Sequence, residues 1–112
     1  MRITALFTAL LLLLLFAAGG VSAVSITDDL GVTVTIENPP ERIVSLSPAN
    51  SEILFALGLD EKIVGVTEYC TYPEAALSKE KIGGFSTVNI EKVSVLNPDL
   101  IVAADGNSEE TV

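Results

Sequence analysis

The stretch RIVSLSPANSEILFALG, residues 42–58, decides the fold. Residues 43–46 are mostly β-branched and apolar, which is typical of a strand buried on both faces. Ser47 and Pro48 end this pattern, because a serine hydroxyl accepts hydrogen bonds from the free N–H groups of a helix start and proline suits the first helical position. The stretch therefore predicts a strand, a tight polar turn and a helix.

The helix is expected to end at Gly58, which suits the left-handed conformation that ends many helices. Ile53, Leu54 and Leu57 recur at helical spacing, which predicts that they form the face packed against the core. In an open α/β sheet, the turn before such a helix lies at the carboxyl end of a strand, where ligands usually bind. An ordinary strand–helix connection without a ligand is the alternative.

The sequence after residue 58 continues to alternate between strand and helix patterns. Strands are predicted at residues 62–67, 81–85 and 99–104, and helical segments at residues 73–77 and 89–96. Gly65, inside the first of these strands, indicates that another segment approaches its backbone closely. The alternation predicts the α/β class, with a Rossmann-like parallel sheet flanked by helices.

Two further segments precede this domain, which we expect to span residues 42–112. Residues 1–23 contain Arg2, a long apolar run and small residues at the end, the pattern of a cleaved secretory signal. An uncleaved membrane anchor is the alternative. Residues 24–41 predict a β-hairpin followed by a stiff, proline-rich connector. Asp28 and Asp29 in the hairpin turn lack the other ligands of a calcium loop, so we expect a solvated turn.

Composition excludes several functions. The formal net charge of −9 over 112 residues argues against nucleic acid and anionic membranes as partners. Cys70 is the single cysteine and histidine is absent, so neither an intrachain disulfide nor a thiol–imidazole pair can form. The carboxylates show no pattern that converges on a substrate or a metal ion. We therefore expect no catalytic residue, no metal site and no enzyme.

An ordered series of motifs resembles the periplasmic-binding domain of ABC transporters for iron-siderophores and cobalamin. The series begins with RIVSLSPANSE and continues with Gly65-Val66, YCTYP (69–73), GGF (83–85), NIEK (89–92) and NPDLI (97–101). Proteins of this family have two α/β lobes joined by a long helix and hold the ligand between them. The resemblance covers only the first lobe, so we expect an N-terminal fragment of a bilobal protein. A self-sufficient miniature lobe is the alternative.

The resemblance also implies a ligand site on the loops. Tyr69 and Phe85 stand where the cobalamin-binding relatives place aromatic contacts, although those relatives tend to have tryptophan at the second position. They can carry another tryptophan where this sequence has Ala104, which leaves a siderophore, haem or another corrinoid open as the ligand. For both aromatic residues, core packing is the alternative. The expected ligand-binding residues are Ser47, Pro48, Asn50, Tyr69 and Phe85.

The NIEK motif implies a contact with the transporter. In the resembled family, an exposed glutamate at this position meets arginines on the outer face of the permease, which assigns that role to Glu91. The position is suitable, because Glu91 lies in the first helical turn and off the face that carries Ile90, Val93 and Leu96. A helix-start acid without a partner is the alternative.

Together, these features predict an exported, extracytoplasmic and monomeric binding protein. Its ligand is expected to be a metal chelate, either cobalamin or another corrinoid, or a ferric siderophore. Its expected partner is an ABC permease in the membrane, and no resident cofactor is expected. An extracytoplasmic sensing or interaction module that uses the same lobe without transport is the alternative.

Overall fold

The computed structural model describes Gly20 and residues 22–111. The expected signal sequence, residues 1–23, therefore lies almost entirely outside the described residues. The chain divides into two compact units, Met1–Pro39 and Pro40–Val112, and each is described by itself. Within the described ranges, no helix has both the length and the apolar character needed to cross a lipid bilayer.

The first unit contains the predicted β-hairpin. Its strands are β1 (Val24–Thr27) and β2 (Thr33–Ile36), which pair antiparallel. The carboxylate of Asp28 accepts hydrogen bonds from the backbone N–H groups of Leu30 and Val32, at 2.9 and 2.8 Å. This aspartate therefore stabilises the turn itself.

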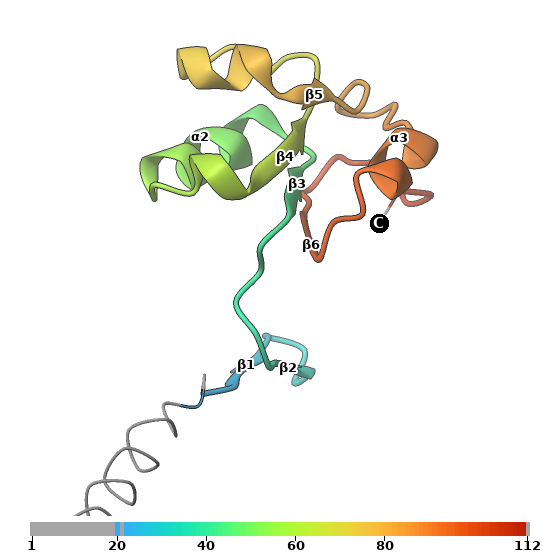
Figure 1. The fold of residues 1–112 in the computed structure, drawn as a ribbon. Helices are drawn as coiled ribbons and strands as arrows, with labels where there is room; N and C mark the ends of the chain where they lie inside the picture. Colours follow the sequence, from blue (N-terminus) through green and yellow to red (C-terminus); the bar gives the residue numbers. More distant parts are fainter. Residues whose placement is uncertain (1–19, 21, 112) are drawn as a thin grey trace, which may run out of the picture. The chain divides into compact units, whose positions relative to one another are not determined.

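The second unit contains a four-stranded parallel sheet with the strand order β5-β4-β3-β6 (Figure 1). The strands are β3 (Ile43–Ser45), β4 (Ile63–Val66), β5 (Glu80–Lys81) and β6 (Leu100–Val102). β3 lies inside the sheet, and its residues are all buried. This arrangement confirms the predicted α/β class and the strand at the start of the deciding stretch.

Two strands differ from their predicted form. The strand expected at residues 81–85 is confined to β5, because the chain then turns back and forms an isolated antiparallel bridge between Gly83 and Val88. The strand expected in the core at residues 99–104 is β6, which pairs only with β3 and stands at one edge of the sheet. Its residue Ile101 is consequently 48% exposed.

The helical segments lie close to their predicted positions. They are α2 (Pro48–Ala56), the short 3-10 helices η1 (Asp60–Lys62) and η2 (Glu74–Ser78), and α3 (Ile90–Val95). Ser47 caps α2 and Asn89 caps α3, each by accepting a hydrogen bond from a backbone N–H in the first turn. Gly58 follows α2 with φ of +78°, as expected for a helix end.

The apolar face predicted for α2 is wrong in part. Ile53 and Leu57 are 59% and 68% exposed, whereas Ser51 and Leu54 are the buried residues of this helix. The hydroxyl of Ser51 donates to that of Ser45 on β3 and lies 3.0 Å from the carbonyl of Ser47, which turns this polar position towards the sheet. Helical spacing identifies the helix, but these contacts decide which face is packed.

The core consists of two hydrophobic clusters. The first contains Leu54 from α2 and Ala76 from η2, and the second contains Val93 from α3. α2 and α3 lie on opposite sides of the sheet in Figure 1, so each cluster fills one face. The absence of a side chain at Gly65 on β4 leaves room for Leu96, which packs on the second cluster, because an added Cβ would stand 2.7 Å from the Leu96 side chain. The predicted close approach at this glycine is therefore confirmed.

A carboxylate fixes the amino end of β3. Asp99 accepts hydrogen bonds from the backbone N–H groups of Glu41, at 2.9 Å, and Arg42, at 2.8 Å. The guanidinium of Arg42 in turn donates to the carbonyl of Leu96. These hydrogen bonds, with the N–H of Glu41 as the largest cause, hold the pKa of Asp99 below its ordinary value of 3.8.

Candidate functional site

The loops that follow the parallel strands meet at one edge of the sheet. They are residues 46–47 after β3 with the first turn of α2 (48–50), residues 67–70 after β4, 82–88 after β5 and 103–107 after β6, and together we call them the carboxyl edge. Hydrogen bonds join neighbouring loops, for example from the N–H of Glu68 to the carbonyl of Gly83 at 2.9 Å. Parallel α/β sheets usually bind ligands at this edge.

The turn after β3 is held by its own polar groups. The hydroxyl of Ser47 is buried and accepts from the N–H of Asn50 at 3.2 Å, so it serves the helix cap. The side-chain amide of Asn50 donates to the carbonyl of Ala103 at 2.9 Å, which ties the start of α2 to the end of β6. Pro48 occupies the first helical position. Ligand contact by Ser47, Pro48 and Asn50 stays a prediction.

A buried polar network lies directly beneath this turn. The hydroxyl of Ser51 donates to that of Ser45 at 2.9 Å and lies 3.1 Å from the thiol of Cys70, which also lies 3.3 Å from the hydroxyl of Thr67. All of these residues are buried. The thiol therefore links α2 to the loop after β4. Among the described residues, no group of three or more histidine, cysteine or acidic side chains could hold a metal ion.

The predicted aromatic residues lie on adjacent loops of the carboxyl edge. Tyr69 is 65% exposed, and its ring lies near Gly84, where an added Cβ would stand 3.7 Å from Cε2. Phe85 follows directly and is half-buried. Its ring lies on Gly106, where an added Cβ would stand 3.0 Å from Cε1. Tyr69 therefore does not pack in the core, whereas Phe85 is partly packed against the loop after β6.

Asn107 belongs to the same edge and is not among the ligand-site residues expected from the sequence. Its side-chain amide contacts the loop after β3 and the loop that carries Phe85. The available signal was weak: an asparagine following Gly106 directly after the carboxyl end of a strand. Both glycine and asparagine are common in turns, so this signal does not distinguish a turn residue from a long-range contact.

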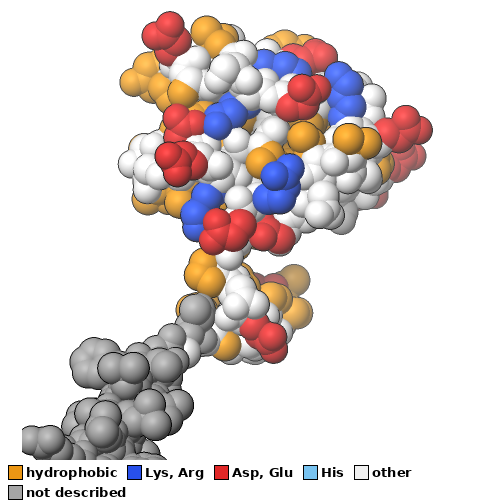
Figure 2. Space-filling view, in the orientation of Figure 1, with side chains coloured by type: hydrophobic (Ala, Val, Ile, Leu, Met, Phe, Trp, Pro, Cys, Tyr) orange, Lys and Arg blue, Asp and Glu red, His pale blue; other side chains and the backbone are white. Residues whose placement is uncertain are grey.

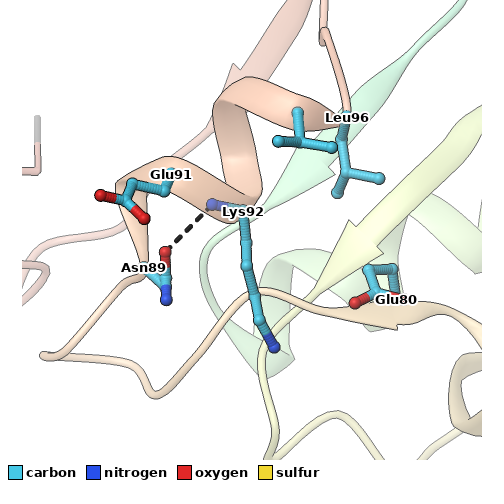
Figure 3. A pocket seen from close by; sticks show the side chains of 6 residues that line it. Glu80, Asn89, Glu91, Lys92 and Leu96 are labelled. Carbon is cyan, nitrogen blue, oxygen red and sulfur yellow. Dashed lines mark hydrogen bonds between the residues drawn. The ribbon is translucent and has the colours of Figure 1, made fainter.

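Glu91 lies elsewhere, beside a groove of about 500 Å³ along α3 (Figure 3). The groove is lined by Glu80, Asn89, Glu91, Lys92, Val95 and Leu96. The ammonium of Lys92 donates to the carbonyl of Lys81, and Figure 3 shows it pointing away from the carboxylate of Glu91. Among the described residues, the ion pairs are Lys62–Glu41 and Lys79–Asp60, so the carboxylate of Glu91 is open to solvent.

Known proteins share this architecture and much of this sequence. A substrate-binding lipoprotein of an ABC transporter from Bacillus subtilis, YvrC, is 48% identical over 84 residues, which are 75% of this chain and 26% of the relative. The crystal structure of the periplasmic vitamin B12 binding protein BtuF of Vibrio cholerae matches with a TM-score of 0.61 and 48% identity, over 64% of this chain and 29% of that one.

A third likeness is to the periplasmic heme-binding protein RhuT from Roseiflexus sp. RS-1. Its TM-score is 0.61 at 39% identity, over 65% of this chain and 28% of that chain. The chain thus spans about a quarter of the length of the relatives that it matches. The family model described as periplasmic binding protein matches residues 43–111, which include β3 and every loop of the carboxyl edge. With this match over more than half of its length, the chain belongs to the periplasmic binding protein family.

Proposed function

We propose that this chain supplies one ligand-facing surface of a substrate-binding protein that delivers a metal chelate to an ABC permease. The observation that supports it most is the convergence of Tyr69 and Phe85 at the carboxyl edge, within the region that matches the family. The relatives are named as vitamin B12-binding, heme-binding and ABC transporter proteins, which favours transport over sensing. We infer no enzymatic role, because the family is one of binding proteins.

The ligand class follows from the two aromatic rings. Cobalamin and haem are large, partly planar metal chelates, and a planar ring system packs well on exposed aromatic faces. Tyr69 offers such a face to solvent, and Phe85 offers one supported by Gly106. These faces favour a flat ligand such as a corrinoid or a porphyrin, and the names of the relatives favour the same two classes. A ferric siderophore remains in the proposed class.

The carboxyl edge of one lobe covers a ligand from one side. Good sites enclose roughly 70–90% of the ligand surface, so a single surface leaves most of a large chelate in water. We expect the 112-residue chain to bind cyanocobalamin or haemin with a dissociation constant no better than about high micromolar. Tight binding requires a second surface that faces Tyr69 and Phe85.

Glu91 is proposed to contact the permease. Its carboxylate is exposed in the first turn of α3, where the helix dipole favours a negative charge. A permease arginine could donate charge-assisted hydrogen bonds to it without displacing an existing partner. The groove that Glu91 lines does not include the aromatic residues of the carboxyl edge, so docking and ligand contact would use separate surfaces.

The proposed location is outside the cytoplasm, after export. The names of the relatives, periplasmic and lipoprotein, support this location. On the face shown in Figure 2, acidic side chains lie interspersed with lysine and arginine over the second unit, rather than leaving one large basic surface. On this face there is thus no large basic surface for nucleic acid, in keeping with a small ligand and a permease as the proposed partners.

Titration of the exported chain with cyanocobalamin, haemin and ferrichrome tests the proposed function. Tyr69→Ala is expected to weaken the binding of the chelate by about fivefold, because it removes one aromatic face. Tyr72→Ala is the matched control, since Tyr72 is equally exposed, at 69%, but lines a hollow beside α2. Equal affinities for the wild type and both variants, or no binding of any chelate at millimolar protein, would contradict the proposal.

A further inference from the structure

Asn107 lies where the loops after β3, β5 and β6 meet. Its side-chain nitrogen donates to the carbonyl of Phe85 at 2.7 Å and to that of Leu46 at 3.0 Å. Its side-chain oxygen accepts from the backbone N–H of Ala104 at 2.7 Å. One planar amide thus joins the ends of three segments that are distant in the sequence.

These contacts suit asparagine in particular. Two carbonyl groups require two N–H donors, and the N–H of Ala104 requires an acceptor, which a primary amide supplies together. An aspartate has the same shape and keeps the bond to Ala104, but it places an oxygen against the carbonyls of Leu46 and Phe85. The side chain is half-buried, so losing these bonds leaves partly desolvated carbonyl groups without their donor.

The neighbouring residue completes the support for Phe85. Asn107 holds the backbone of Phe85, and Gly106 lies under its ring, where an added Cβ would stand 3.0 Å from Cε1 and 3.2 Å from Cζ. Gly106 adopts φ of +98°, which side chains other than glycine rarely adopt. Residues 106–107 therefore determine both where the Phe85 backbone lies and how its ring is presented.

We propose that Asn107 is a positioning residue of the ligand site, which acts through Phe85 and does not itself contact the ligand. The proposal rests on the proposed function of the carboxyl edge. Without the amide, the carbonyls of Phe85 and Leu46 lose their shared partner, and the loop of residues 82–88 is no longer tied to β3. Phe85 then presents its ring in several positions, and a flat ligand gains less from it.

The first test requires no ligand. In nitrogen-15 NMR spectra of the exported protein, Asn107→Asp is expected to shift the backbone amide signals of Phe85 and of Ser86, whose N–H shares a peptide group with the Phe85 carbonyl, while the N–H of Ala104 stays protected from hydrogen exchange. Asn97→Asp is the matched control, because it adds the same charge at an exposed asparagine outside the carboxyl edge. Unchanged signals for Phe85 and Ser86 in Asn107→Asp would overturn the proposal.

If Asn107→Asp does not fold, hydrogen exchange of side-chain amides in the wild-type protein tests the proposal instead. The side-chain amide protons of Asn107 should then exchange at least about tenfold more slowly than those of exposed Asn97, because they are hydrogen-bonded. Equal exchange of the two side chains would overturn the proposal.

The second test distinguishes positioning from a general structural role. Asn107→Asp should weaken cyanocobalamin binding by about fivefold in the wild type but by less than about twofold in a Phe85→Ala background, because its effect passes through the ring. An equal loss in both backgrounds would overturn the proposal. If the wild type binds none of cyanocobalamin, haemin and ferrichrome, the proposed function fails, and the NMR signals of Phe85 alone decide the role of Asn107.

Discussion

The two ends of the sheet are held by different chemistry. At the amino end of β3, an exposed carboxylate and an exposed guanidinium, those of Asp99 and Arg42, bond the backbone. At the carboxyl edge, neutral groups do the same work, namely the amides of Asn50 and Asn107 and the buried hydroxyl of Ser51. Charged, exposed groups respond to acid and salt, whereas neutral groups do not. The bonds by which Asn50 and Asn107 join the loops at the proposed ligand end should therefore be less sensitive to acid and salt than those at the amino end.

The largest expected effect is the loss of the buried hydroxyl at the carboxyl edge. Ser51→Ala leaves the hydroxyl of Ser45 and the thiol of Cys70 short of a partner, which should lower the free energy of unfolding by about 2 kcal/mol. Urea denaturation checks this value, with Ser78→Ala as an exposed control on η2. A loss no larger than that of the control would show that the network contributes little.

A second substitution separates backbone strain from the support of Phe85. Gly106→Ala and Gly58→Ala both force alanine into positive φ, at +98° and +78°, so each should destabilise the fold by about 1 kcal/mol. Only Gly106→Ala also displaces the Phe85 ring, since space around Gly58 is open. We expect ring signals of Phe85 to shift in NMR spectra of the first variant alone. If the Phe85 ring signals of Gly106→Ala and Gly58→Ala were the same, the contact between Gly106 and the Phe85 ring would be contradicted.

The stability that Asp99 contributes at the amino end should depend on pH. Because the pKa of Asp99 is lowered on folding, its carboxylate adds stability that is complete above its ordinary value of 3.8 and is lost as the pH falls through its lower folded value. Asp99→Asn removes this contribution, so the difference in stability between wild type and variant should shrink below pH 3.8. Urea midpoints measured between about pH 6 and pH 2 test the prediction. A constant difference would exclude the carboxylate as its source.

Glu91→Ala is expected to have the smallest effect on the two ends of the sheet. Glu91 takes no part in the hydrogen bonds at the amino end of β3 or in those at the carboxyl edge, and it lines the groove along α3. In a two-lobed protein that contains this lobe, the substitution should leave chelate affinity unchanged and weaken permease association by roughly 1–3 kcal/mol. Glu109→Ala serves as the control, since it removes the same charge from another exposed position. Unchanged permease affinity would remove Glu91 from the docking surface.

Local patterns predicted most of the fold. The cap at Ser47, the left-handed Gly58 and the close approach at Gly65 all follow from rules about neighbouring residues, and all are confirmed. The predicted apolar face of α2 failed at Ile53 and Leu57, because packing on the sheet selected another side of the helix. Helical periodicity shows which residues share one face of a helix, but it does not show which face packs against the sheet.

The carboxyl edge was predicted less completely. Tyr69 and Phe85 were identified through a family resemblance, and their exposure and contacts agree with loop positions, although ligand contact remains a proposal. Asn107 could not be found, because its partners Leu46 and Phe85 lie 61 and 22 residues away along the chain. A contact at such separation depends on which strands become neighbours, and no local pattern contains that information.

The amides of the carboxyl edge have a consequence for how such sites change over time. Asn50 and Asn107 bond only main-chain atoms of the residues opposite them, those of Leu46, Phe85, Ala103 and Ala104. Side chains at positions 85 and 104 can therefore be exchanged without breaking these bonds. Descendants of one ancestral lobe could thus acquire new chelate preferences through single substitutions while inheriting the same scaffold intact.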